Sequence, residues 1–133
     1  NKFSWSDAGD ETNKLEIDLF FISCWGDSII PQGYELDIKR KQIYFVNPVI
    51  NYLDIKDGKR TYKMKFGREK TMEIFDCLNK VNLSNLSQYV VLDQDRRNYT
   101  IRLMLNNSKI SEYTIPDNLL PSDLRELYEA IIE

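Results

Sequence analysis

The feature that most constrains this chain is one long helical pattern with strand-like segments on both sides. Over residues 67–81, apolar side chains recur at the spacing of a single helix face, and charged side chains occupy the other face. The apolar stripe consists of Thr71, Ile74, Phe75, Leu78 and Val81. An isolated amphipathic helix of this length is marginally stable in water. The pattern therefore predicts that this helix covers a sheet built from the flanking segments.

Strand patterns precede this helix. Residues 15–23 alternate between apolar and acidic side chains and then become apolar on both faces, which predicts a strand that enters the centre of a sheet. Residues 34–38 and 43–46 alternate around a polar turn, which predicts a hairpin. Two further extended segments, separated by a turn signal, cover residues 49–55 and 60–66.

Three more strand patterns follow the helix, at residues 88–92, 99–105 and 109–115, and they predict a meander. A final helix is expected over residues 122–133, with Ser122 as its N-terminal cap. Its apolar stripe consists of Leu124, Leu127, Tyr128 and Ile131. The order of elements predicts an α+β fold in which a mainly antiparallel sheet is covered by two helices.

Length and composition fit one compact domain. The chain has 133 residues, of which 42% are hydrophobic and 29% charged, so a sizeable core is expected. We expect residues 1–14 to form a flexible leader, typical of a mature or trimmed chain, and residues 15–133 to form the domain. The net charge of −3 argues against a dedicated nucleic-acid binder. No stretch is apolar for long enough to predict a transmembrane segment.

The two cysteines leave two interpretations open. Cys24 and Cys77 are far apart in sequence and form no metal-binding or redox pair motif. They are either two small buried side chains or a disulfide that joins the helix to the first strand. A disulfide would imply an oxidising compartment.

Sequence motifs for catalysis or metal binding are not evident. The chain contains no histidine, which removes the commonest general base and the commonest metal ligand. Its five glycines have no phosphate-loop or dinucleotide-binding spacing. Residues 93–98 carry several side-chain oxygens but lack the central glycine and distal glutamate of a calcium loop. We therefore assign no catalytic residue, no cofactor and no metal site.

Two groups of residues are candidates for binding. Trp25, Ile29 and Ile30 lie in a loop rich in turn residues, where they either form a lid on the core or belong to a recognition surface. Lys63 and Lys65 belong to the densest run of basic residues, and the strand pattern places both on one face. This run could present a cationic surface to an acidic partner, an anionic lipid or a phosphate. The alternative is a solvated face whose lysines discourage edge pairing.

The pattern resembles uncharacterised bacterial lipoprotein domains. The resemblance rests on early strands, a helix, a strand meander and a short terminal helix. It is carried by Ile38 through Ile43-Tyr44-Phe45, the segment 67–81, Tyr89 through Tyr99-Thr100-Ile101, and Ile115-Pro116 leading into Pro121-Ser122-Asp123-Leu124-Arg125-Glu126-Leu127. It implies a cell-envelope or periplasmic location through a lipidated N-terminus upstream of this chain, and it brings no catalytic residues. A cytoplasmic location is the alternative.

These observations favour a non-enzymatic protein-binding module, an envelope-associated protein with an unidentified protein partner. One alternative is an immunity-type inhibitor that blocks a toxin, which predicts a stable complex with a protein encoded beside it. A further alternative is a small enzyme that uses carboxylates or Cys24. That enzyme would need a thiol of low pKa in an open cleft.

Overall fold

The computed structural model describes residues 4–7, 10–29, 31–46, 60–83, 86, 95–105 and 109–133, with backbone alone for residues up to 16 and for residue 109. It has the predicted α+β architecture. The strands are β1 (Ser4–Asp7), β2 (Asp10–Trp25), β3 (Gln32–Asp37), β4 (Gln42–Val46), β5 (Arg60–Lys63), β6 (Asn98–Leu105) and β7 (Lys109–Pro116). The helices are α2 (Arg68–Lys80) and α3 (Ser122–Ile132), with a short 3-10 helix, η2 (Asp117–Leu119), before α3.

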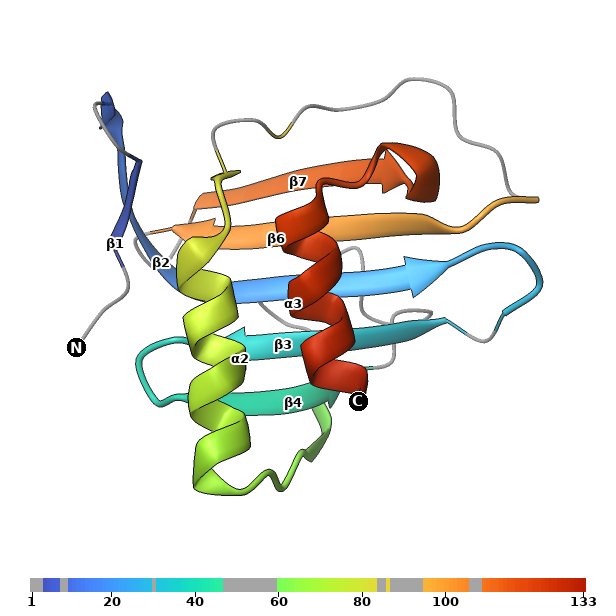
Figure 1. The fold of residues 1–133 in the computed structure, drawn as a ribbon, viewed down its shortest axis with the longest axis horizontal. Coiled ribbons are helices and arrows are strands. Elements are labelled where there is room, and N and C mark those ends of the chain that lie inside the picture. The colour runs from blue at the N-terminus through green and yellow to red at the C-terminus, as the bar shows by residue number, and fades with distance from the viewer. Residues whose placement is uncertain are drawn as a thin grey trace.

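The sheet is antiparallel and has β2 near its centre. Its strand order is β5-β4-β3-β2-β6-β7, and β1 pairs with the first part of β2. The second part of β2 pairs with β3 on one side and β6 on the other (Figure 1). Phe20 lies opposite Leu36 in β3 and Leu103 in β6, so a row of apolar side chains crosses three strands. The prediction that this segment enters the centre of a sheet is confirmed.

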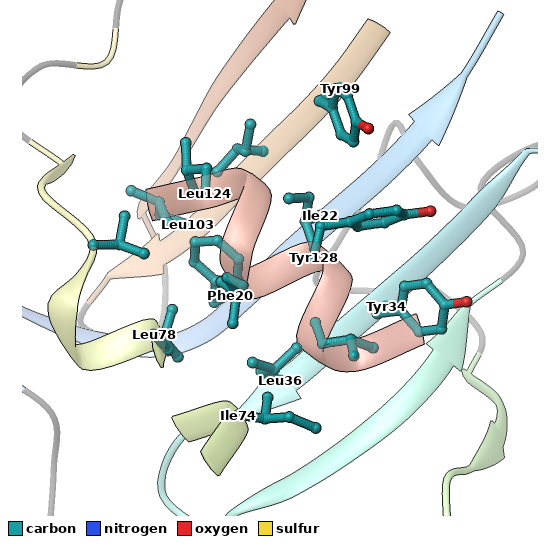
Figure 2. Close-up of a cluster of buried hydrophobic side chains, with 14 of the residues drawn as sticks. Phe20, Ile22, Tyr34, Leu36, Ile74, Leu78, Tyr99, Leu103, Leu124 and Tyr128 are labelled. Carbon is teal, nitrogen blue, oxygen red and sulfur yellow. The ribbon is translucent and has the colours of Figure 1, made fainter. Parts of the chain in front are cut away.

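Both helices cover the same face of the sheet (Figure 1). Ile74 and Leu78 of α2 and Leu124 of α3 have no exposed surface, and they meet the apolar row of the sheet. Figure 2 shows these side chains enclosed between the two layers. Because burying an apolar side chain of this size stabilises a protein by about 1.5–3 kcal/mol, this contact supplies the core.

Three tyrosines join α3 to the sheet. The ring of Tyr128 in α3 meets Tyr34 of β3 edge-on at 5.9 Å and Tyr99 of β6 edge-on at 5.3 Å. Their hydroxyl groups point toward the same end of the sheet (Figure 2). Edge-to-face geometry is favourable because the positive rim of one ring meets the negative face of another. The position of α3 across β3 and β6 is therefore fixed by aromatic contacts as well as by aliphatic packing.

The start of α3 differs from the sequence prediction. Ser122 was expected to cap this helix, and that prediction is wrong, because Ser122 is the first helical residue and the N-cap is Pro121. The carboxylate of Asp123 instead accepts a hydrogen bond of 2.9 Å from the backbone N–H of Asn82, which follows α2. This bond ties the start of one helix to the end of the other.

The other predicted elements divide into three groups. The helix over 67–81, the hairpin of β3 and β4, and the last two strands are confirmed. The expected strands at 49–55 and 88–92 lie outside the described residues. In the segment expected to be a leader, β1 pairs with the beginning of β2. None of the described helices has both the length and the apolar character needed to cross a bilayer.

Replacing Ile74 by alanine should destabilise the fold strongly. The side chain is fully buried, so its loss removes apolar contact and leaves a cavity beneath α2, at an expected cost of about 2–5 kcal/mol. Met72, on the same helix and 55% exposed, provides the control, and Met72→Ala should change the free energy of unfolding by less than about 0.5 kcal/mol. Urea unfolding of both variants measures the difference. Equal effects would contradict the packing described above.

Candidate functional site

A groove lies between the β3–β4 turn, β4, the segment that follows β5, and the first turn of α2. We call it the cationic groove. Its volume is about 370 Å³. The lining residues are Arg40, Lys41, Gln42, Ile43, Lys63, Met64, Lys65, Phe66 and Thr71. They come from the turn, from β4, from β5 with the segment after it, and from α2, so the groove exists only in the folded chain.

The lining is strongly unbalanced in charge. It contains four cationic side chains, and none of these lining residues is Asp or Glu. The chain as a whole carries a net charge of −3, so the described lining of the groove has the opposite sign to the chain. A concave surface lined by one sign of charge concentrates the electric field and attracts ligands of the other sign.

The β3–β4 turn positions one wall of the groove, and Asp37 organises this turn. One carboxylate oxygen of Asp37 accepts a hydrogen bond of 3.1 Å from the backbone N–H of Arg40, and the other accepts one of 3.1 Å from its guanidinium. Short side chains that bond to a nearby backbone N–H stabilise turns of this kind. The guanidinium of Arg40 is therefore held beside the groove while its side chain stays 70% exposed.

Lys41 has an unusual backbone conformation for a lysine. Its φ is +54°, in the left-handed region that favours glycine. The ammonium donates a hydrogen bond of 3.1 Å to the carbonyl of Ile38 and lies 5.6 Å from the ring centre of Phe75 in α2. Although the residue is exposed overall, desolvation of this end lowers the pKa of Lys41. The turn thus holds a partly dehydrated cation beside the groove.

The opposite wall follows β5. The backbone N–H of Met64 donates a hydrogen bond of 2.8 Å to the carbonyl of Ile43, which keeps this segment against β4. Lys63 and Lys65 are both exposed, whereas Met64 and Phe66 pack against the core. The positive end of the α2 dipole lies nearby and adds to the potential of the lysines. The lining of the groove therefore combines exposed cations with the half-buried side chains of Met64 and Phe66.

Buried charges support the turn from the face of the sheet opposite the helices. Arg60 of β5 donates a hydrogen bond of 2.6 Å to Glu35 of β3 and lies 3.6 Å from Asp37. Its guanidinium also stacks over the ring of Tyr44 at 3.9 Å. Asp37 is thus shared between Arg60 and Arg40, so the ion pairs on this face determine how the groove is built.

Glu35 is the member of this network with the clearest change in acidity. It is 2% exposed, and desolvation raises its pKa even though its hydrogen bond to Arg60 acts in the opposite direction. A raised pKa means that the folded chain holds the proton of Glu35 more tightly than the unfolded chain. This carboxyl therefore lowers stability as the pH rises from the unfolded-state pKa through the folded-state value.

The structure brings together only part of the predicted binding residues. Lys63 and Lys65 line the same groove. Trp25 donates a hydrogen bond of 3.0 Å from its indole to the hydroxyl of Thr100, and Ile29 packs against the core, so neither belongs to the groove. Ile30 lies outside the described residues.

Sequence reasoning missed the other half of the groove, Arg40 and Lys41. The sequence did carry a signal for these two residues, because three consecutive cations, Lys39 to Lys41, occupy the turn between β3 and β4. A polar turn is normally a solvated connection, and a sequence does not show which loop lies beside which strand. Hairpin pairing of β3 with β4, and of β4 with β5, brings the two basic segments together.

The cysteines do not form a candidate nucleophilic centre. Cys24 and Cys77 are both free thiols, so the disulfide interpretation has no support in this structure. Desolvation raises the pKa of both, whereas an activated thiolate needs a lowered pKa. Within the described residues, no cluster of Cys, Asp and Glu is arranged to hold a metal ion.

No protein-family model matches the chain, and no curated protein or solved structure is significantly similar to it. These comparisons therefore assign neither a fold family nor an activity.

Replacing Glu35 by glutamine should change how stability depends on pH. The reference pKa is 4.5, and burial raises it in the fold, so the wild-type chain should lose stability as the pH rises from about 4.5 toward the folded-state pKa. The amide in Glu35→Gln cannot ionise, so the variant should gain stability relative to wild type over that window and then reach a constant difference. Urea unfolding at a series of pH values measures this. A difference that falls with rising pH would show that the Arg60 ion pair outweighs desolvation.

The conformation of residue 41 has its own test. Glycine adopts a positive φ without steric cost, whereas alanine keeps most of the strain. Lys41→Gly should therefore be more stable than Lys41→Ala by about 1 kcal/mol, since both lose the same side-chain contacts. Thermal or urea unfolding of the pair measures the difference. Equal stabilities would contradict a left-handed residue 41.

Proposed function

We propose that this chain is a non-enzymatic protein-binding module whose principal contact surface is the cationic groove. The observation that carries the proposal is the clustering of Arg40, Lys41, Lys63 and Lys65 around one concavity, with no Asp or Glu among its described lining residues. The chemistry that complements such a surface is acidic. The partner is therefore a protein that presents carboxylate side chains.

The physical character of the groove supports protein contact over a purely solvated surface. Lysines that only discourage edge pairing need no fixed position, yet the ammonium of Lys41 is hydrogen-bonded and placed against Phe75. A non-glycine residue at positive φ costs free energy, and such strain is commonly retained where a side chain is used. The half-buried side chains of Met64 and Phe66 add some apolar area that a partner can bury.

The size of the groove indicates what share of an interface it can supply. A stable interface usually involves about 20–30 residues on each side, and a few central ones carry most of the binding energy. The nine groove residues would form that central part. Arginine is enriched among such central residues, because its planar guanidinium binds carboxylates through two hydrogen bonds.

Two biological settings are consistent with this proposal. An envelope-associated protein is the setting implied by the resemblance to bacterial lipoprotein domains, and an immunity-type inhibitor is the alternative. Both act by forming a complex, so both need a defined contact surface. The raised pKa values of the two thiols favour this binding class over a thiol-dependent enzyme.

Neutralising two of the four cationic residues of the groove should strongly weaken partner capture. In Lys63→Gln/Lys65→Gln, two exposed cations are lost and recovery of a bound partner from extracts of the source organism should fall at least about tenfold, because the attraction to carboxylates is lost. Quantitative mass spectrometry of the co-purified proteins measures recovery at low salt. Added salt should weaken capture by the wild-type chain.

The matched control is Lys80→Gln/Arg97→Gln, which removes the same amount of charge from two exposed residues that do not line the groove. It should retain the partner. If both double variants capture it equally, the groove is not the contact surface. If both lose it equally, net charge and not the groove determines binding.

A further inference from the structure

Within the described part of the sheet, the strand beside the groove, β5, has an open edge. Among the described strands, β5 is the last in the sheet order on its side, with β4 as its only paired neighbour. All four of its residues are exposed, and Tyr62 is 55% exposed. An exposed edge strand offers unpaired backbone N–H and C=O groups to any extended chain that can align with it.

The pairing pattern shows which backbone groups face outward. Met64 donates its N–H to the carbonyl of Ile43, and the same antiparallel register pairs Lys63 with Tyr44 and Tyr62 with Phe45. In an antiparallel pair, residues that exchange hydrogen bonds alternate with residues whose backbone groups point away. The N–H and C=O of Lys63 therefore point away from β4, toward the open edge.

The side chains of β5 have two different characters on its two faces. Lys63 lies on the same face as Tyr44, its cross-strand neighbour. Tyr62 lies on the other face, where its ring stacks on Phe45 with the ring centres 5.3 Å apart. A strand added beside β5 would place alternate side chains next to the lysine and next to the tyrosine.

We propose that the partner binds through an extended segment that adds to the sheet beside β5, with acidic residues alternating with apolar ones. Its carboxylates pair with Lys63 and, beyond the end of β5, with Lys65, while its apolar side chains contact Tyr62. Strand addition of this kind draws affinity from backbone hydrogen bonds and specificity from alternate side chains. This inference rests on the proposed function, because it concerns the partner of the same groove.

A second copy of this chain is a poor occupant of the same edge. Pairing β5 with β5 would bring Arg60, Lys63 and Lys65 against an identical set of cations. Like charges opposite one another destabilise paired strands. Charge complementarity therefore favours an acidic segment of another protein.

The test uses the full chain and the blocked peptide Ser-Glu-Val-Glu-Val-Glu-Val-Ser. A matched peptide with the same sequence carries an N-methyl group on each of its six central residues, which removes the N–H donors of both strand edges and keeps every charge. Fluorescence anisotropy should show binding of the parent peptide and at least about tenfold weaker binding of the methylated one. Amide exchange of the Lys63 N–H should slow when the parent peptide is bound.

Two variants of residue 63 separate the backbone contribution from the charge. Lys63→Gln removes the charge and keeps the outward N–H, whereas Lys63→Pro removes both, and proline is tolerated where a strand N–H faces solvent. Lys63→Pro should bind the parent peptide at least about threefold more weakly than Lys63→Gln. The comparison of the two peptides uses the wild-type protein. It therefore tests strand addition even if Lys63→Pro folds poorly.

Several outcomes would overturn the strand-addition proposal. Equal affinity for the two peptides, with no slowing of Lys63 exchange, would show docking by side chains alone and leave the proposed function standing. No binding of either peptide would overturn the proposed segment chemistry. Sedimentation that shows a dimer of the wild-type chain, lost in Lys63→Pro, would assign this edge to a second copy.

Discussion

The burial of one sheet face beneath α2 and α3 is the interaction on which the rest of the structure depends. Phe20, Leu36 and Leu103 form a row across three strands, and both helices pack on that row. The same packing brings Phe75 of α2 against Lys41 of the β3–β4 turn. Closing the core therefore positions one cation of the groove, Lys41, while the carboxylate of Asp37 holds Arg40 in the same turn.

Much of this fold follows from local sequence patterns. The stripe in α2 and the alternation along β3, β4 and β6 predict element type, because helix and strand have different side-chain periods. The order of the strands could not be predicted from local patterns, because β2 pairs with β6, which follows it in sequence only after the β3–β4 hairpin, β5 and α2. Ser122 shows that sequence patterns place the end of a helix only approximately. Its side chain suits a cap, but the preceding proline has the backbone conformation that the cap position requires.

Only two of the four cationic residues of the groove could be predicted from the sequence, because the other two reach it through long-range pairing. Lys63 and Lys65 belong to a dense basic run, so composition alone reveals them. Arg40 and Lys41 occupy a turn that is separate in sequence, and hairpin pairing together with the contact to α2 brings them to the same place. Trp25 illustrates a different case. An aromatic residue in this loop suggests either a lid on the core or a recognition surface, and in the structure the indole donates a hydrogen bond to Thr100 that joins two strands.

The central position of β2 also has a consequence for folding during synthesis. β2, β3, β4 and β5 pair with neighbours in sequence, so this part of the sheet depends on short-range contacts that form early. The other edge of β2 receives β6 only after the helix α2 and a long connection have been made. Until then, the apolar face and one edge of β2 are uncovered in the growing chain. The chain is therefore most prone to aggregation or chaperone binding while it is being synthesised, because this strand edge is then exposed.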